Sequence, residues 1–219
     1  MYLYDIHTHQ VKIEDAADYE VKCILNTYPE SFHSKKQEYA GGWFSCGIHP
    51  WYAQDAAELD VLADIVKDDA VLAVGEVGLD KLQGPDMSAQ IAVFRQQIEL
   101  AVGVDKPLII HCVKAWDELI SLYKEYKTSI PWIIHGYRGN PDQTRQLIRL
   151  GFKLSVGEYF NPDSLREIPT DSIFCETDMS EISICHVYKA VFGCMKVDFD
   201  QFAFYIRENM GKNFKILSK

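Results

Sequence analysis

The 219-residue sequence is short of several features, and each shortage excludes a class of protein. No apolar run approaches the length needed to cross a bilayer, so we expect no membrane span. None of the six cysteines forms a C-x-x-C pair, and Cys46, Cys112 and Cys175 lie inside apolar segments. This pattern predicts buried, reduced thiols and argues against a disulfide framework or a zinc–thiolate site. The N-terminus lacks the basic-then-apolar layout of a secretory signal, which indicates a cytoplasmic protein.

Positive charge is also scarce. The chain has 22 Lys and Arg against 32 Asp and Glu, a formal net charge of −10. That balance argues against a protein that binds a long nucleic-acid duplex through many phosphates, because such binding needs a basic face. It leaves phosphate chemistry at a metal centre open, because bound ions would then carry the local positive charge. No linker, low-complexity tract or charge run marks a boundary, so we expect one domain over residues 1–219.

The sequence does contain a regular alternation of strand and helix patterns in a chain that is 47% hydrophobic. Strands that are apolar on both faces, each followed by a helical pattern, predict a parallel sheet covered by helices. Eight such units predict a compact (β/α)8 TIM barrel, shorter than the typical length of about 250 residues. An open doubly wound sheet is the alternative, but no Gly-rich phosphate loop follows the first strand. The expected strands lie at residues 1–9, 21–26, 43–50, 70–76, 107–111, 131–135, 153–157 and 172–178.

Several residues mark where the expected helices begin and end. Ser88 is expected to cap a long helix, and Asn140 and Asn161 each precede a proline at a first helical position. Further expected features are a helical turn around residues 14–19, a helix over 30–40, a helix capped by Asp55, and a last helix over 198–210.

Polar residues with metal-ligating side chains stand at the ends of the expected strands. His7 and His9 are two apart and so share one face of their strand, and a pair of imidazoles makes half of a metal site. A hydrogen-bonded histidine pair is the alternative for these two residues. Taken singly, His111 could be a core histidine and Asp178 a helix cap. Because carboxyl ends of barrel strands meet at one face, we expect these side chains to form an active site: His7, His9, Glu76, His111, His135 and Asp178.

Four histidines and two carboxylates suffice for two divalent ions that share one bridging ligand. Two ions about 3.5–4 Å apart can clamp a phosphoryl or carbonyl oxygen and lower the pKa of a bound water toward neutrality. The reaction class that this set serves best is hydrolysis. The ligand types suit Zn, Mn, Fe or, less well, Mg, and do not choose among them.

The same residues belong to segments that resemble the signature motifs of the TatD family of metal-dependent deoxyribonucleases. The segments follow that family's order and span nearly the whole chain: Asp5-Ile6-His7-Thr8-His9, Gly47-Ile48-His49-Pro50, Gly75-Glu76-Val77-Gly78-Leu79-Asp80, Ile110-His111-Cys112, His135-Gly136-Tyr137-Arg138-Gly139 and Glu176-Thr177-Asp178. The resemblance implies a distorted TIM barrel of the metallo-dependent hydrolase type. It implies a phosphodiesterase that uses two divalent ions (Mg, Mn or Zn) to trim DNA ends or short nucleotides.

The resemblance also implies roles for single residues. His7, His9, Glu76 and Asp178 would hold one ion, and Glu76, His111 and His135 the other, so Glu76 would bridge the two. Asp178 would also orient or deprotonate the attacking water, which makes Asp178 and Glu76 the expected catalytic residues. No membrane and no obligate protein partner are implied.

Three residues are expected to contact substrate phosphates: His49, Lys114 and Arg138. Their alternatives are a packing histidine and solvated loop charges. Asp5 and Glu176 each share a strand face with a ligand two residues on, so either could fix the geometry of a ligating side chain.

The chain departs from the family pattern after Asp178, where Met179-Ser180-Glu181 replaces the expected proline-containing loop. Other chemistry therefore stays open. The same metal set could hydrolyse a small phosphate ester or an amide, since barrels with a His-x-His on the first strand include phosphatases. A metal-binding protein with a degenerate substrate groove is the third possibility.

Overall fold

A computed structural model describes residues 1–11, 19–54, 57–214 and 216 of the chain. Its strands lie in one sheet in chain order, with a helix after most of them, and this order confirms the (β/α)8 fold class. The expected helical turn at 14–19 lies outside the described residues except for its last residue. Asp55, which was expected to cap a helix, also lies outside them. The strands are β1 (Tyr2–Thr8), β2 (Glu20–Thr27), β3 (Trp43–Cys46), β4 (Val71–Asp80), β5 (Leu108–Val113), β6 (Trp132–Ile134), β7 (Lys153–Val156) and β8 (Ile173–Cys175).

Most of the remaining described residues are helical. None of the described helices is long and apolar enough to cross a membrane. All six cysteines lie in described segments and are free. Cys46 and Cys175 are buried, as predicted, whereas Cys112 is only half-buried. The helices are α1 (Phe32–Glu38), the 3-10 turn η1 (Pro50–Tyr52), α2 (Ala57–Ile65), α3 (Met87–Val104), α4 (Trp116–Tyr126), α5 (Pro141–Leu150), α6 (Pro162–Leu165), α7 (Ile184–Met195) and α8 (Phe199–Asn213).

Two compact units make up the fold. The terminal unit comprises Met1–Leu25 and Ile133–Lys219, and the central unit comprises Asn26–Trp132. The single-domain organisation stays a prediction.

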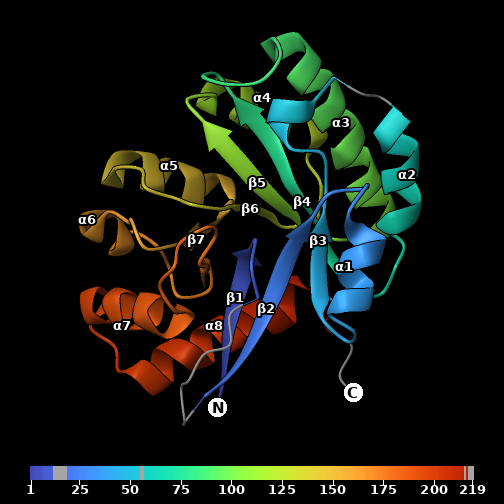
Figure 1. The fold of residues 1–219 in the computed structure, drawn as a ribbon. Helices are drawn as coiled ribbons and strands as arrows, with labels where there is room; N and C mark the ends of the chain where they lie inside the picture. The colour runs from blue at the N-terminus through green and yellow to red at the C-terminus, as the bar shows by residue number, and fades with distance from the viewer. Residues whose placement is uncertain (12–18, 55–56, 215, 217–219) are drawn as a thin grey trace. The chain divides into compact units, whose positions relative to one another are not determined.

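In the terminal unit, the C-terminal helices pack against the N-terminal strand. Both α7 and α8 lie beside β1, far from it in sequence (Figure 1). The buried Tyr188 hydroxyl donates to the Tyr4 carbonyl and accepts from the Tyr4 N–H, each at 3.0 Å. A parallel bridge between Thr8 and Asp178 then joins the end of β1 to the segment after β8. The strand that carries His7 is therefore held on two sides.

In the central unit, β3, β4 and β5 pair in parallel, and α3 packs against β4 (Figure 1). The prediction that β4 ends at Glu76 is wrong. The register between β4 and β5 shifts between Val74 and Val77, and regular pairing then resumes and continues to Asp80. Glu76 therefore lies at an irregularity inside a strand that is buried along its whole length.

The cap of α3 also differs from the expectation. The Asp86 carboxylate, not Ser88, accepts the Ala89 N–H at 2.9 Å, so the helix begins at Met87. Ser88 instead donates its hydroxyl to Asp86. A carboxylate at the cap also interacts favourably with the positive end of the helix dipole, which explains why Asp86 takes this position.

Replacing Gly78 by alanine is expected to destabilise the protein by about 2–5 kcal/mol. Gly78 has a φ of +136°, and a Cβ there would lie 2.1 Å from the His111 carbonyl oxygen of the paired strand. Urea unfolding followed by circular dichroism measures the change. The matched control is Gly103→Ala in α3, where a Cβ meets nothing within 4 Å. That change should stabilise the protein by about 0.5–1 kcal/mol. Equal midpoints for the two variants would contradict the assignment of strain to Gly78.

Candidate metal centre

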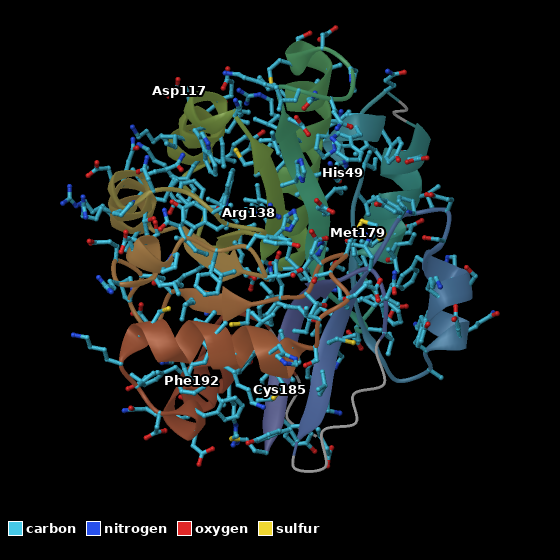
Figure 2. All side chains as sticks on the ribbon, turned by 60° about the vertical axis from the view of Figure 1, so that its left-hand side comes forward. His49, Asp117, Arg138, Met179, Cys185 and Phe192 are labelled. Carbon is cyan, nitrogen blue, oxygen red and sulfur yellow. The ribbon has the colours of Figure 1, made fainter. Side chains whose placement is uncertain are left out.

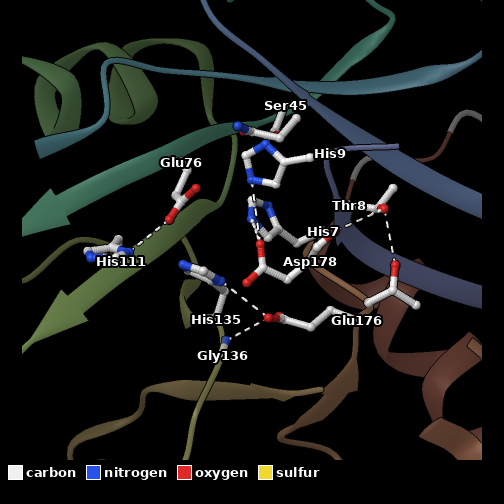
Figure 3. A network of polar contacts seen from close by, with 12 residues as sticks. His7, Thr8, His9, Ser45, Glu76, His111, His135, Gly136, Glu176 and Asp178 are labelled. Carbon is white, nitrogen blue, oxygen red and sulfur yellow. Dashed lines mark hydrogen bonds and ion pairs between the residues drawn. The ribbon is translucent and has the colours of Figure 1, made fainter. Parts of the chain in front are cut away.

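The terminal unit gathers four of the six predicted ligands into one cluster, which we call the terminal cluster: His7, His9, His135 and Asp178. Asp178 Oδ1 lies 3.5 Å from His9 Nε2 and 3.7 Å from His7 Nε2 (Figure 3). The rings of His7 and His135 are 4.4 Å apart between centroids. One potential ligand atom from each of His7, His135 and Asp178 lies within 4.8 Å of the others. This spacing suits a shared divalent ion.

Backbone contacts aim Asp178 at the histidines. The Asp178 N–H donates to the His7 carbonyl at 2.9 Å, and the His9 N–H donates to the Asp178 carbonyl at 3.2 Å. Asp178 itself adopts a left-handed conformation with φ of 51°, which aspartate tolerates better than most residues. The carboxylate is therefore held beside the end of β1, three residues after β8 ends.

Glu176 holds His135 in the orientation that a metal ligand needs. Its Oε1 accepts the Gly136 N–H at 2.7 Å and lies 3.2 Å from His135 Nδ1 (Figure 3). Burial works to raise the pKa of the Glu176 carboxyl, but the charge and hydrogen bond of His135 outweigh it and lower that pKa. An ionised Glu176 accepts a hydrogen bond from the Nδ1–H of His135. The proton then stays on Nδ1, and Nε2 keeps the lone pair that can bind a metal. The residues therefore fit a divalent ion.

Replacing Glu176 by glutamine is expected to weaken metal binding by about 10–100-fold, because a neutral amide oxygen accepts the His135 Nδ1–H less strongly than a carboxylate does and makes the ring a weaker ligand. Glutamine keeps an oxygen that can accept the Gly136 N–H, so the fold should be retained. Isothermal titration of the metal-free protein with Mn²⁺ or Zn²⁺ measures the effect. The matched control is Glu167→Gln, which alters a carboxylate that pairs with Arg145 on the surface of the same unit. Unchanged metal affinity in Glu176→Gln would contradict this role.

Asp5 organises the backbone rather than an imidazole. Its buried carboxylate accepts the His7 N–H at 3.2 Å, the Thr177 N–H at 3.1 Å and the Thr177 hydroxyl at 2.6 Å. Burial raises the pKa of Asp5 to about 7, with the Thr177 hydrogen bonds acting against the rise. Asp5 thus ties the strand that carries His7 to the segment between Glu176 and Asp178.

The central unit holds a second group, which we call the central cluster: His49, Glu76 and His111. Glu76 Oε1 lies 2.8 Å from His111 Nδ1 and 3.2 Å from His49 Nε2 (Figure 3 shows the contact with His111). Glu76 is buried, and ligand atoms of the three residues lie within 4.8 Å of one another. Sequence reasoning placed His49 with the substrate contacts, whereas the structure places it against the Glu76 carboxylate.

The hydrogen bonds of the central cluster assign a different task to each histidine. His49 Nδ1 accepts the Trp51 N–H at 3.2 Å, so in the neutral ring the proton is on Nε2 and points to Glu76. His49 therefore orients the carboxylate by donating to it. His111 has carboxylates at both ring nitrogens, because its Nε2 lies 3.2 Å from Asp80 Oδ2.

Asp80 is a site residue that the sequence reasoning did not assign. Burial works to raise the pKa of its carboxyl, but hydrogen bonds from the Trp51 indole at 2.7 Å, from the Leu82 N–H and from His111 lower it. The signal was present in the sequence, since residues two apart share a strand face and Asp80 lies four residues after Glu76. The expected strand end at Glu76 hid this relation.

The remaining predicted substrate residues lie after strands. Lys114 follows β5, is exposed and has a left-handed φ of 54°. Arg138 follows β6, is exposed and lines a pocket that also contains Asp178. The phosphate contacts expected of His49, Lys114 and Arg138 stay predictions.

The chain is similar to known proteins in sequence and in fold. Residues 5–191 match a family model described as TatD related DNase, and that range includes both clusters. An uncharacterized metal-dependent hydrolase from Haemophilus influenzae is 29% identical over 158 residues, covering 64% of this chain and 60% of that protein. The 3'-5' ssDNA/RNA exonuclease TatD from Edwardsiella piscicida is 29% identical over 151 residues, covering 62% of this chain and 57% of that protein. The matched segments span 54–60% of the length of the first curated relatives.

A solved structure shares the fold. The crystal structure of YJJV, a TatD homologue from Escherichia coli K12, matches with a TM-score of 0.83 at 22% identity, over 98% of each chain. A likeness of this extent shows the fold.

Proposed function

The chain belongs to the TatD-related DNase family, and from this premise we propose that it is a divalent-metal-dependent hydrolase that cleaves phosphodiester bonds in DNA ends or short nucleotides. The observation that carries the proposal is the presence of two His–carboxylate groups, His7–His135–Asp178 and His49–Glu76–His111, with potential ligand atoms within 4.8 Å of one another inside each group. The homologues' names support metal-dependent hydrolysis, and one of them names an exonuclease. The cytoplasmic location and the absence of an obligate protein partner stay predictions.

We propose that each cluster holds one divalent ion. His7, His9, His135 and Asp178 would bind the first, and Glu76 and His111 the second, with His49 orienting Glu76. Imidazole and carboxylate donors suit Zn or Mn, and Mg less well. The family-derived allocation, in which Glu76 bridges the ions and His135 binds the second, is the competing arrangement. Metal content measured in His135→Ala, with equilibrium titration of the ion that remains, separates the two.

A divalent ion held by such a cluster would lower the pKa of a bound water toward neutrality and would offset phosphate charge. The chain's own residues then have distinct tasks. Asp178 is the solvent-facing member of the terminal cluster, with a side chain 34% exposed against 0% for His7. Its carboxylate can therefore accept a proton from an attacking water. Glu176 and Asp5 hold the histidines and the backbone around it, so the reacting groups need little reorganisation.

Cleavage of an end-labelled single-stranded oligonucleotide by purified protein, with Mn²⁺ or Mg²⁺ and with chelator, tests the proposal. Stepwise shortening that the chelator stops is the expected result, and the labelled end shows the polarity of digestion. Inorganic phosphate released from nucleoside monophosphates is followed in parallel. An intact oligonucleotide, from protein shown to have taken up metal, would overturn the phosphodiesterase assignment.

A further inference from the structure

The terminal unit has a pocket of about 490 Å³ whose lining includes Asp178 of the terminal cluster. Three segments line it, at residues 136–138, 157–159 and 176–182, which follow β6, β7 and β8. Its volume falls in the range of about 300–1,000 Å³ that is usual for small-ligand sites. A nucleotide whose phosphate reaches Asp178 would place its sugar and base here.

Part of the pocket lining is a platform of the kind on which bases stack. The Arg138 guanidinium lies 5.3 Å from the centroid of the Tyr159 ring. Tyr159 is 62% exposed and Met179 is 66% exposed, so both have surface left for a ligand (Figure 2 marks Arg138 and Met179). Aromatic rings and guanidinium planes stack on the faces of unpaired bases, at about 1–3 kcal/mol per base.

Acidic residues also form part of the pocket wall. Glu158 and Glu181 line the pocket, and Glu158 accepts a hydrogen bond from the Ser180 hydroxyl. Ionised carboxylates accept hydrogen bonds and donate none, and they repel a phosphate. This wall therefore suits the base of a nucleotide better than its phosphate. Guanine presents two adjacent N–H donors on its Watson–Crick edge, which match one carboxylate, whereas thymine presents a single N–H between two carbonyls.

We propose that this pocket is a base-binding subsite, in which Tyr159 and Arg138 stack the terminal base and Glu158 favours guanine over thymine. The inference rests on the proposed function for the position of the phosphate. It gives Arg138 a task different from the phosphate contact predicted from sequence. It also gives a role to Met179-Ser180-Glu181, the segment that departs from the family pattern.

Binding of three ligands without turnover tests the subsite. The ligands are dGMP, dTMP and 2-deoxyribose 5-phosphate, which has no base, titrated calorimetrically into the protein with Ca²⁺. Wild type should bind dGMP about tenfold more tightly than dTMP. Tyr159→Ala should weaken dGMP about tenfold. Tyr159→Phe keeps the aromatic ring and should bind dGMP with the affinity of wild type. Glu158→Gln should remove the difference between dGMP and dTMP. The matched control is Phe204→Ala, which removes an exposed aromatic on α8, away from the pocket.

The outcome that overturns the subsite is the same dGMP affinity in wild type and Tyr159→Ala. Tyr159→Ala should bind 2-deoxyribose 5-phosphate as tightly as wild type does. A general structural defect would instead weaken the binding of both dGMP and 2-deoxyribose 5-phosphate. Oligonucleotides ending in guanosine or in an abasic nucleotide separate this inference from the proposed function. Cleavage that ignores the terminal base in every variant refutes the subsite and leaves the phosphodiesterase. Tyr159-dependent binding of dGMP without any cleavage supports the subsite and refutes the phosphodiesterase.

Discussion

Replacing Glu76 by glutamine is expected to abolish phosphodiester hydrolysis and to weaken metal binding at the central cluster by more than about 100-fold. The glutamine amide has nearly the same shape, but it lacks the charge that the ion and His111 require. The Glu76 carboxylate lies within 3.2 Å of both histidines of its cluster. Changes to partners of ligands already cost about 10–100-fold in metal affinity, so loss of a direct ligand should cost more.

Metal content per chain and cleavage of the labelled oligonucleotide are measured on the same preparation of Glu76→Gln. The matched control is Asp64→Asn, because Asp64 is an exposed carboxylate of the same unit that pairs with Lys67 on the surface. The control should keep full activity and metal content. Wild-type turnover in Glu76→Gln would show that the central cluster takes no part in hydrolysis.

Replacing Asp178 by asparagine is expected to lower kcat by about 10²–10⁴-fold, the usual contribution of a positioned general base. The amide keeps the backbone contacts with His7 and His9, so the terminal unit should fold as before. What it loses is the ability to accept a proton from water. The defect should therefore persist at saturating metal, whereas the defect in Glu176→Gln should be overcome by excess metal.

Initial rates over a range of metal concentrations distinguish these two carboxylates. Asp163→Asn serves as the control, since Asp163 is an exposed acid of the same unit that faces Arg166. If excess metal restored Asp178→Asn to the wild-type rate, Asp178 would be a ligand only, and the proton would have to go to another group.

Much of this architecture could be predicted from the order of residues alone. The rule that parallel strands end at one edge was enough to single out His7, His135 and Asp178, which the structure brings together in the terminal unit. The predicted end of the strand at Glu76 was wrong, because the apolar pattern breaks there while backbone pairing continues to Asp80. Sequence hydrophobicity reports burial, and it does not report a register shift inside a buried strand.

Other features depend on distances that no local pattern contains. The contact between His135 and Glu176 joins residues 41 positions apart, and the pocket wall combines segments after three different strands. The task of His49 is set by which ring nitrogen meets the Trp51 N–H, which only the fold decides. Residue types therefore indicated a metal hydrolase. The role of each residue within a cluster could be assigned only from the structure.

The residues of the terminal cluster and the residues that line its pocket differ in how they can change over evolutionary time. His7 stands on β1 and His135 directly after β6, where an insertion would disturb strand pairing. Tyr159 and Met179 stand on connecting segments, where length and composition vary at little cost to stability. Descendants of one ancestral hydrolase could thus diverge in the molecules they accept by altering loops, with the ion-binding residues inherited unchanged. Loop libraries at residues 157–159 and 179–182 would reproduce that divergence in the laboratory.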